Sequence, residues 1–324
     1  MIKATFFVED HVYQNNSVFD EKSYLNRDDC LKSFIQLKKV LETKNISLST
    51  QDINAEEKSN FVIYVDFIPK EIKNKNSYLL LFESKLIKPK NWDFSKHENF
   101  LKIFTWDDSL IDKKRYIKIN FSQSLNLIYD NKNRKKHLVQ ISANKIINQE
   151  NELYTERRKI INWHEDNEIS FDFFGYNWDL YISGNRYLDF FTNKIGFRKK
   201  YKNYKGTINS KYEVLKDYRF SYCLENFYSQ DGYITEKIFD CFKTLTIPIY
   251  KGDKSIINHI PEETFINYDN FDNLDDLNNY LLKMSKSRSL EYQSSIKEFL
   301  ESPKAKTFSN EFFVNQIVEN IKFV

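Results

Sequence analysis

Residues 218–252 alternate strand, loop, helix and strand within a short span, and this order restricts the chain to an α/β fold. The pattern predicts strands at 218–224 and 246–250 and a helix at 235–245. Two parallel strands joined by a helix form a right-handed unit. Ligands of such sheets bind at the carboxyl ends of the strands, and a helix N-terminus attracts phosphate groups. The sequence therefore predicts an anion site around residues 225–237.

The placement of glycine and of charged residues divides the chain into two parts. All six glycines follow residue 174, so tight turns and close backbone approaches are confined to the second half. The highly charged stretch 130–136 is a predicted linker. We therefore expect a first domain at 1–135 and a second at 136–305, with a C-terminal helix at 306–324 that packs back on the first domain.

Both parts are predicted to interleave strands with helices, which is typical of parallel α/β layers. Apolar residues at helical spacing predict a helix at 29–43, with Asp28 or Asp29 as its N-cap, and another that begins at Asn273. Residues 176–217 are predicted to form an irregular loop rich in aromatic and basic residues. The other predicted elements are strands at 3–8, 61–67, 78–83, 101–105, 116–121, 137–143 and 171–175, and helices at 152–166, 289–301 and 310–322.

Composition and charge exclude several classes of protein. The 49 basic and 46 acidic residues nearly balance, which argues against a nucleic-acid partner. Three scattered cysteines do not predict a disulfide scaffold or a zinc site. No uninterrupted apolar stretch approaches the ~18 residues of a membrane-spanning helix. We expect a cytoplasmic protein whose contact with the inner face of the membrane is at most peripheral.

The first turn of the helix in the 218–252 stretch carries a carboxylate and an ammonium group side by side. Thr235 is placed to cap the helix, and Glu236 and Lys237 follow it. A cation is unfavourable at this end of the helix dipole, but a bound diphosphate would reverse the penalty by sharing its charge with Lys237 and the free amides. Glu236 is placed to accept hydrogen bonds from sugar hydroxyls. The preceding strand edge, which also carries polar residues, disfavours an ordinary surface Glu-Lys pair.

Four motifs in this order resemble the signature of the α-1,3/1,4-fucosyltransferases, family 10 of the glycosyltransferases. They are YRFSYCLEN at 218–226, GYITEKIFD at 232–240, IPIYKG at 247–252 and PEETFI at 261–266. The resemblance is to bacterial or viral members, and weaker similarity extends towards both ends of the chain. It implies a GT-B-like α/β fold, in which two Rossmann-like domains have the active site in the cleft between them. The domain at 136–305 would bind the donor GDP-sugar, and the domain at 1–135 would be the acceptor side.

The resemblance also implies which residues hold the donor. Asn226, Tyr233, Glu236 and Lys237 match motif positions that bind the nucleotide, the diphosphate and the fucose of GDP-fucose. Family members also place an arginine on the first helix of the donor domain, where it neutralises the leaving diphosphate. The predicted helix at 152–166 offers two arginines for this role, and the first has the better spacing to the apolar face: Arg157 and Arg158.

The general base is expected on the other domain. An inverting sugar transfer needs a carboxylate that takes the proton of the acceptor hydroxyl as the new bond forms. The apolar strand predicted at 78–83 ends in Glu83, which resembles a family strand that ends in Gly-Glu, with Phe82 in place of the glycine. Partial burial at the strand edge would raise the pKa of Glu83. Asp107 and Asp108 are interpreted as a turn rather than a metal pair, and the resemblance implies no obligatory metal.

Together, the motifs and the resemblance predict an inverting glycosyltransferase. It would transfer L-fucose from GDP-β-L-fucose to a hydroxyl of an acceptor glycan, forming an α-fucosidic linkage in protein glycosylation or surface polysaccharide biosynthesis. No cofactor is obligatory, and the partners are the nucleotide sugar donor and the glycan acceptor. Two alternatives stay open: the same mechanism with a different nucleotide-deoxysugar donor, and a catalytically inactive glycan-binding module. The presence of Glu83, Glu236 and Lys237 argues against an inactive module.

Overall fold

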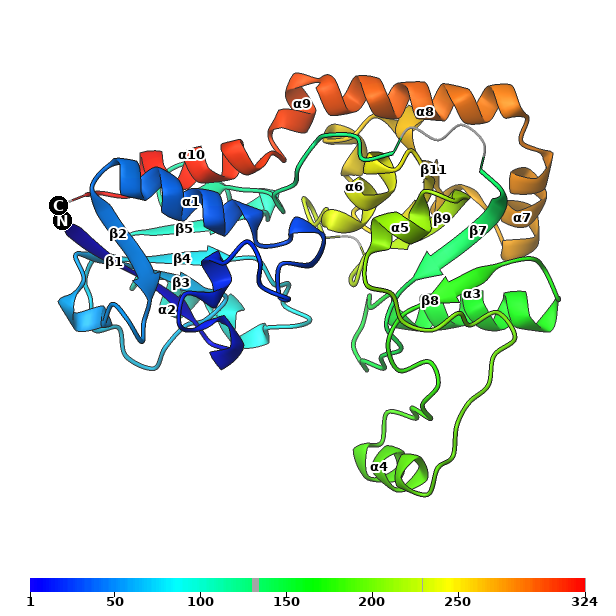
Figure 1. The fold of residues 1–324 in the computed structure, drawn as a ribbon, viewed down its shortest axis with the longest axis horizontal. Coiled ribbons are helices and arrows are strands. Elements are labelled where there is room, and N and C mark those ends of the chain that lie inside the picture. Colours follow the sequence, from blue (N-terminus) through cyan, green and yellow to red (C-terminus); the bar gives the residue numbers. More distant parts are fainter. Residues whose placement is uncertain (130–133, 229, 324) are drawn as a thin grey trace. The chain divides into compact units, whose positions relative to one another are not determined.

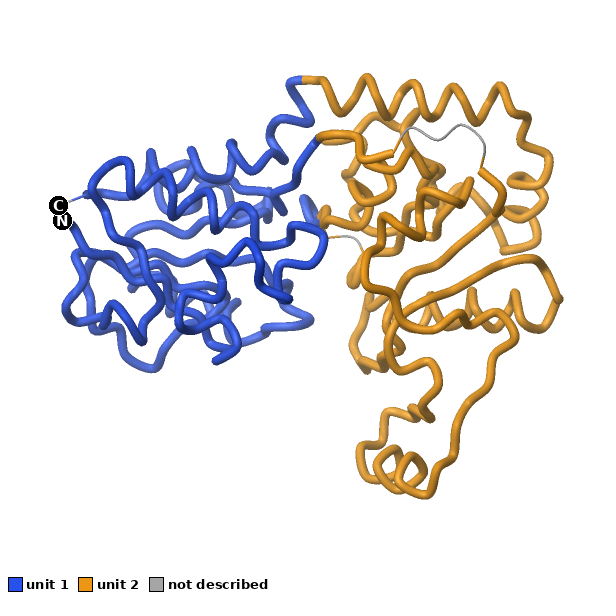
Figure 2. Tube along the Cα trace, in the orientation of Figure 1, with its two compact units in different colours: residues 1–125, 231–233, 303–324 blue, residues 126–230, 234–302 orange. Residues whose placement is uncertain are grey.

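The protein consists of two compact units. The computed structural model describes residues 1–129, 134–228 and 230–323. The first unit comprises residues 1–125, 231–233 and 303–324, and the second comprises 126–230 and 234–302 (Figure 2). The chain therefore passes into the second unit after residue 125 and returns after residue 302, whereas the sequence pattern predicted these borders after 135 and 305.

The predicted linker at 130–136 is only partly visible, because residues 130–133 lie outside the described residues. Its remaining part belongs to the body of the second unit. Arg134 Nη1 donates hydrogen bonds to the carbonyl oxygens of Leu215 and Tyr218, at 3.2 and 2.9 Å. Lys136 is already the first residue of a strand.

The first unit is built on a six-stranded parallel sheet with the strand order β2-β1-β3-β4-β5-β6 (Figure 1). Strand β4 reads Ser-Tyr-Leu-Leu-Leu and is buried throughout, as expected of a parallel strand covered on both faces. The strands are β1 (Ile2–Val8), β2 (Ile46–Thr50), β3 (Phe61–Val65), β4 (Ser77–Leu81), β5 (Lys102–Thr105) and β6 (Tyr116–Lys118). The helices are α1 (Lys32–Thr43), α2 (Phe94–His97), α9 (Pro303–Lys306) and α10 (Asn310–Asn320).

The C-terminal helix α10 lies in the first unit and packs on α1. The ring of Phe313 lies 5.9 Å from that of Phe34 and 5.7 Å from that of Phe82, measured between centroids. Phe313 is almost fully buried within the same apolar core as β1 and β4. The backbone N–H of Lys322 also donates to the Tyr78 hydroxyl at 2.9 Å. The last segment of the chain thus completes the core that the first segment begins.

The second unit is built on a five-stranded parallel sheet with the order β11-β10-β9-β7-β8. Its strands are β7 (Lys136–Ile141), β8 (Asp172–Phe174), β9 (Tyr218–Leu224), β10 (Ile247–Lys251) and β11 (Ile266–Asn267). Its helices are α3 (Tyr154–Asp166), α4 (Arg186–Lys194), α5 (Lys211–Leu215), α6 (Glu236–Lys243), α7 (Leu274–Lys283) and α8 (Lys286–Glu301).

Both sheets follow the same winding. The second strand of each unit lies at the edge beside the first strand, and the third strand lies on the other side of the first. The side on which the next strand is added therefore changes between β1 and β3 in the first sheet, and between β7 and β9 in the second. We call each of these places the reversal point of its sheet. In open α/β sheets, ligands bind at this reversal point, beyond the carboxyl ends of the strands.

Several local predictions differ from the structure. Strand β2 was missed because its sequence, Ile-Ser-Leu-Ser-Thr, is short and half polar. Asp28 and Asp29 were predicted as caps of α1, but both lie in a left-handed backbone conformation before it, and Leu31 occupies the cap position. The region predicted as irregular contains α4 and α5. Among the described residues, no helix has the length and apolar character needed to cross a membrane.

Candidate functional site

A pocket opens at the reversal point of the second unit, where β7 and β9 end and α6 begins. Its volume is about 100 Å³. Three basic side chains line it, together with two acidic ones from the first two turns of α6. Its lining residues are Gln140, Ile141, Ser142, Arg157, Lys211, Leu215, Ser221, Tyr222, Cys223, Leu224, Glu236, Lys237, Asp240 and Cys241. The predicted site residues Arg157, Glu236 and Lys237 are therefore brought together, on the sheet edge where the winding places a ligand.

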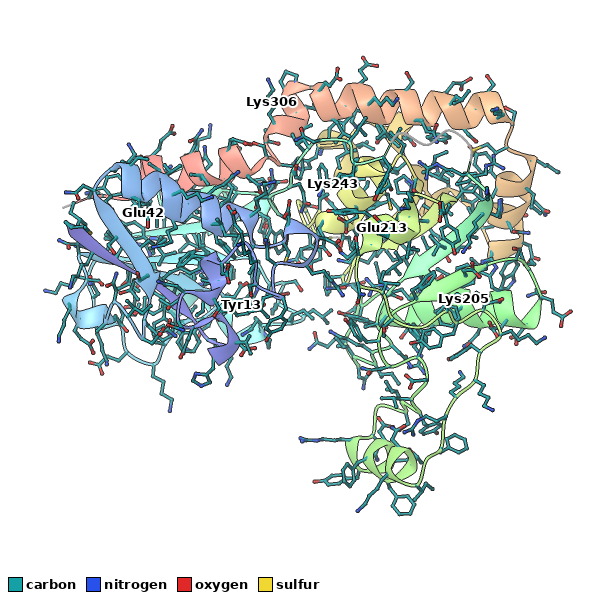
Figure 3. The ribbon with its side chains drawn as sticks, in the orientation of Figure 1. Tyr13, Glu42, Lys205, Glu213, Lys243 and Lys306 are labelled. Atoms are coloured by element: carbon teal, nitrogen blue, oxygen red, sulfur yellow. The ribbon has the colours of Figure 1, made fainter. Side chains whose placement is uncertain are left out.

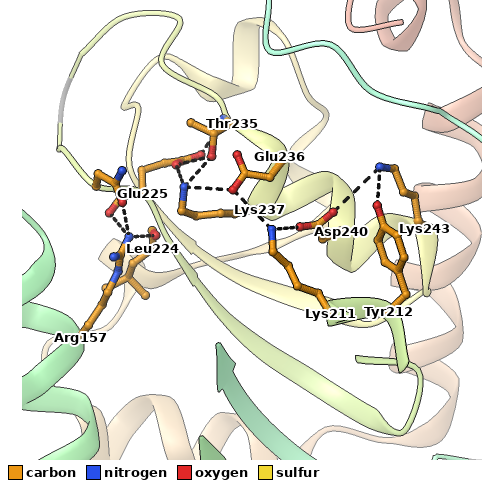
Figure 4. A network of polar contacts seen from close by, with 11 residues as sticks. Arg157, Lys211, Tyr212, Leu224, Glu225, Thr235, Glu236, Lys237, Asp240 and Lys243 are labelled. Carbon is orange, nitrogen blue, oxygen red and sulfur yellow. Dashed lines mark hydrogen bonds and ion pairs between the residues drawn. The ribbon is translucent and has the colours of Figure 1, made fainter. Parts of the chain in front are cut away.

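A buried carboxylate, Glu225, organises this edge (Figure 4). It follows β9 directly and is completely inaccessible to solvent. Its Oε1 accepts the backbone N–H of Thr235 at 2.8 Å, and its Oε2 accepts the Thr235 hydroxyl at 2.7 Å. The same Oε2 lies 3.1 Å from Nζ of Lys237. Gly252 makes room for the carboxylate, since a Cβ at this position would lie 2.6 Å from Cγ of Glu225.

The role predicted for the Thr235 side chain was wrong in detail. Thr235 occupies the cap position of α6, but its hydroxyl makes no capping hydrogen bond. It donates instead to Glu225 and accepts from Nζ of Lys237 at 2.8 Å. Threonine therefore links the carboxylate to the ammonium group. The carboxylate of Glu225 also offsets the unfavourable placement of Lys237 at the positive end of the helix, without any bound anion.

The charges around the pocket hold one another in their ionised forms. Burial alone would lower the pKa of Lys237, but the carboxylates of Glu225 and Glu236 outweigh burial and hold it above its ordinary value. Burial would raise the pKa of Glu236, but Lys237 and Lys211 outweigh it and hold it well below its ordinary range. Nζ of Lys211 lies 3.5 Å from Glu236 and 2.7 Å from Asp240. The pocket edge therefore stays charged at neutral pH.

Of the two predicted arginines, only Arg157 lines the pocket. Arg157 is buried, and its Nη2 donates to the carbonyl oxygens of Leu224 and Glu225 and to Oδ1 of Asn226, at 2.6, 2.8 and 3.0 Å. These bonds fix the backbone at the end of β9. Arg158 is one residue further along α3. Hydrogen bonds from Ser183 lower the pKa of Asp189, and Arg158 adds a smaller electrostatic contribution in the same direction. Asn226 contacts Arg157 but does not line the pocket.

Tyr233, the remaining predicted donor residue, belongs to the first unit. Residues 231–233 are part of that unit although they connect β9 with α6. The Tyr233 ring is almost fully buried and packs edge-to-face on Trp106 and Phe121, with centroids 4.9 and 5.6 Å away. Gly232 beside it has φ of 85°, and a Cβ there would meet the carbonyl oxygen of Trp106 at 2.4 Å. Glycine is thus required for this close approach.

The predicted base, Glu83, lies at the carboxyl edge of the first sheet, directly beyond β4, beside a second carboxylate. Oδ1 of Asp66, which follows β3, accepts the backbone N–H groups of Phe82 and Glu83 at 2.8 and 2.9 Å. Burial raises the pKa of Asp66 to about 7, and the nearby Glu83 carboxylate adds to the shift. Asp66 was not predicted from the sequence. It lies in the connection between β3 and β4 and has a left-handed backbone conformation, with φ of 46°.

The acidic pair after β5 behaves as a turn. Asp107 accepts hydrogen bonds from the backbone N–H and the hydroxyl of Ser109, at 3.0 and 2.6 Å. Asp108 pairs with Nζ of Lys118 at 2.6 Å. Within the ranges that the structure describes, no three His, Cys, Asp or Glu residues gather in a way that would hold a metal ion.

Sequence reasoning missed two other residues of the pocket edge. Glu225 was noted as part of a motif but was given no role, and Lys211 fell in the region predicted as irregular. The signal for Glu225 was its position directly after a strand that is largely apolar and, apart from Arg219, buried, where a carboxylate needs partners. Lys211 reaches Asp240 over many intervening residues, so no local pattern points to it.

Comparison with known proteins identifies a family for a stretch that lies mainly in the second unit. The family described as "Glycosyltransferase family 10 (fucosyltransferase) C-term" matches residues 132–299, which is more than half of the chain. An alpha-(1,3)-fucosyltransferase, FucT of Helicobacter pylori, is 37% identical over 75 residues. That match spans 23% of this chain and 14% of the relative.

Solved structures extend the similarity in fold to the whole chain. An alpha1,3-fucosyltransferase with GDP-fucose has a TM-score of 0.54 at 15% identity, covering 99% of this chain and 90% of the other. T4 phage BGT in complex with UDP and Mn²⁺ has a TM-score of 0.57 at 15% identity and is covered completely, as is this chain. At these identities the comparison shows the fold alone. It confirms the predicted α/β, GT-B-like fold.

Proposed function

We propose, starting from the fact that this chain belongs to glycosyltransferase family 10, that it transfers L-fucose from GDP-β-L-fucose to a hydroxyl group of an acceptor glycan. The transfer would invert the configuration at the anomeric carbon and form an α-fucosidic linkage. The observation that carries this proposal is the pocket of the second unit. It places Arg157, Lys211 and Lys237 together at the reversal point of the sheet and at the start of α6. Cations and a helix N-terminus together favour a phosphate-bearing ligand.

The diphosphate would be held mainly by Lys237. Its side chain is 25% exposed, so it can meet a ligand while Glu225 and Thr235 fix the position of its ammonium group. As the bond to the sugar breaks, negative charge develops on the leaving diphosphate, and fixed cations stabilise it most at that moment. Arg157 supports the same region by holding the end of β9. Asn226 and Tyr233 are assigned to the donor on their motif positions alone.

The sugar would be oriented by Glu236. Its side chain is 40% exposed and its carboxylate is ionised, so it presents acceptor oxygens to sugar hydroxyls at the mouth of the pocket. Lys237 and Lys211 hold that carboxylate from two sides, at 3.7 and 3.5 Å. A fixed carboxylate of this kind favours a donor with hydroxyls in matching positions.

The acceptor proton would be taken by Glu83 on the first unit. Glu83 lies two residues beyond the fully buried strand β4, and its backbone N–H donates a hydrogen bond to Asp66. Because side-chain cations are placed to neutralise the leaving diphosphate, we propose that no metal is obligatory. A transfer assay with and without a chelator tests this point, and a strict requirement for a divalent cation would contradict it.

The donor is tested by thermal unfolding with a panel of nucleotide sugars: GDP-fucose, GDP-mannose, UDP-glucose and GDP alone. We expect GDP-fucose to raise the unfolding temperature most. Greater protection by another nucleotide sugar would replace fucose in the proposal and keep the fold and mechanism. No protection by any of them would favour an inactive glycan-binding module.

Two substitutions separate the diphosphate contact from the sugar contact. Lys237→Gln is expected to weaken binding of GDP in titration calorimetry, whereas Glu236→Gln is expected to keep GDP affinity and weaken only GDP-fucose. Lys202→Gln is the matched control, since Lys202 is an exposed lysine of the same unit that pairs with Glu168. Unchanged GDP affinity in a folded Lys237→Gln protein would remove the assigned role of Lys237.

A further inference from the structure

Helix α4 exposes the side that a helix usually buries. None of its residues is buried, and the three with the lowest exposure are all polar: Asp189, Thr192 and Asn193. The exposed large apolar residues in and just after the helix are Tyr187, Leu188, Phe190, Phe191, Ile195 and Phe197. Tyr187 is 86% exposed, and even Leu188, the least exposed of these six, reaches 44%. An exposed apolar group of this size marks a surface that binds something.

The orientation of α4 is fixed by its polar side. Oδ1 of Asp189 accepts the backbone N–H and the hydroxyl of Ser183 at 2.7 and 2.6 Å. Oδ1 of Asn193 accepts the N–H of Tyr181, and Nδ2 of Asn193 donates to the Tyr181 carbonyl, at 3.1 and 2.8 Å. The polar side is therefore tied to the preceding loop, and the aromatic side must face away from it.

Hydrogen bonds from within the chain stabilise both ends of α4. Asn185 caps it through hydrogen bonds that its Oδ1 accepts from the N–H groups of Tyr187 and Leu188. Arg198 Nη1 donates to the carbonyl oxygen of Asn193 at the other end. Within the second unit, α4 lies apart from the sheet at the end of a long hairpin, and its side chains spread outwards (Figures 1 and 3). A preformed, outward-facing apolar helix loses little conformational entropy on binding.

The charge of the chain is concentrated in the same segment. Residues 186–200 contain five basic residues and one acidic residue, a net charge of +4. The rest of the chain then holds 44 basic and 45 acidic residues, which nearly balance. The one acidic residue, Asp189, is turned towards Ser183. The exposed aromatic side is thus flanked by basic residues such as Lys194 and the run Arg198-Lys199-Lys200.

We propose that α4 and the turn after it bind the surface of an anionic lipid bilayer, with the aromatic side in the headgroup region and the basic residues on the lipid phosphates. Interfacial helices combine aromatic residues on one side with lysine and arginine around it. A second copy of this chain is a poorer occupant, because two segments of net charge +4 would repel each other. This inference stands apart from the pocket and its proposed reaction.

The test uses the full chain and two kinds of vesicle in a co-sedimentation assay. The vesicles are phosphatidylcholine with about 30 mol% phosphatidylglycerol, and phosphatidylcholine alone. We expect binding to the anionic vesicles to be at least about tenfold stronger than to the neutral ones, and to weaken as salt increases. Failure of the full chain to bind the anionic vesicles, or equal binding to both kinds, would overturn the proposal.

Substitutions then locate the binding surface. Tyr187→Ser combined with Phe190→Ser and Phe191→Ser is expected to weaken binding to anionic vesicles at least about tenfold, because all three rings are exposed and none supports the core. The matched control changes two exposed aromatic residues of the first unit, Tyr24→Ser and Phe94→Ser, and should leave binding within about twofold.

Two measurements keep the result interpretable. Circular dichroism and the unfolding temperature of the triple variant should match the unsubstituted chain, since the three side chains are largely exposed and lie outside the core. Sedimentation velocity tests the competing occupant: a dimer that disappears in the triple variant would assign this surface to a second copy and overturn the lipid proposal. The lipid proposal would also be overturned if the folded triple variant bound vesicles as strongly as the unsubstituted chain.

Discussion

The pairing of Glu225 with Lys237 can be tested by a double-mutant cycle on stability. The changes are Glu225→Gln, Lys237→Met and the two together. Glutamine keeps an oxygen that can accept the Thr235 N–H, and methionine keeps the length of the lysine chain, so both variants remove charge with little loss of packing. Lys237→Met removes the ammonium partner of the buried Glu225, and Glu225→Gln leaves Lys237 with only the more distant Glu236, at 3.7 Å.

The magnitude follows from the separation and the burial of the two groups. Coulomb's law with an effective dielectric constant of about 20 gives about 5 kcal/mol for charges 3.1 Å apart. Lys237 is 25% exposed, so solvent screening reduces this value. Hydrogen bonds to charged groups contribute about 1.5–3 kcal/mol in proteins, and we expect a coupling energy of about 2 kcal/mol. Each single variant should lose about 3 kcal/mol because it removes the nearest partner of a largely buried charge.

The assay is urea unfolding of all four proteins, followed by circular dichroism and tryptophan fluorescence. The control is the same cycle on Lys202 and Glu168, which approach within 2.7 Å but are both more than 70% exposed. Their coupling should be at most about 0.5 kcal/mol despite the shorter distance, because exposed pairs contribute little. A Glu225–Lys237 coupling no larger than that of the control would refute the argument that burial makes this pair strong.

Four further predictions concern other parts of the molecule. Glu83→Gln is expected to slow transfer at least about 100-fold while GDP affinity stays unchanged in calorimetry, because a general base contributes roughly 10²–10⁴ in rate; near-normal turnover would exclude Glu83. Asp66→Asn should change the pH dependence of urea unfolding. The folded pKa of about 7 lies above that of the unfolded chain, so the native state binds the extra proton and the unsubstituted chain loses stability as pH rises through about 7. The variant should lack that loss, and identical pH profiles would contradict the shift. Gly232→Ala should cost about 2 kcal/mol or more, because its φ is positive and a Cβ would collide with the Trp106 carbonyl; an unchanged unfolding temperature would speak against that contact. Phe313→Ala should cost about 3–5 kcal/mol in the unfolding of the first unit, and a loss below about 1 kcal/mol would place α10 outside the core.

Much of the fold could be predicted from the sequence because it depends on local patterns. The alternation of apolar strands with amphipathic helices predicted nearly all the strands. The helix predicted to begin at Asn273 is α7, in which Asn273 occupies the N-cap position. The elements that were missed had weak local signals. Strand β2 is half polar, and α4 has its aromatic residues on the side that faces solvent, so neither follows the usual pattern of burial.

The candidate site, like the fold, could be predicted only in part. The strand end, the start of α6 and the adjacent Glu236 and Lys237 could be placed from the sequence, because strand and helix termini are defined by neighbouring residues. The partners of those residues could not. Glu225 reaches Lys237 only because β9 and β10 pair in one register and Gly252 leaves space beside it. Lys211 reaches Asp240 through the packing of α5 on α6.

The sequence by itself therefore determined which residue types stand at the ends of strands and at the first turn of α6. Only the tertiary structure decided which of them meet, since side chains far apart in the chain come together through strand register and helix packing. It also decided that Tyr233 belongs to the core of the first unit and that Asp66 lies beside Glu83. The shifted pKa values of Asp66, Glu236 and Lys237 follow from that packing, because burial and neighbouring charges are properties of the folded chain.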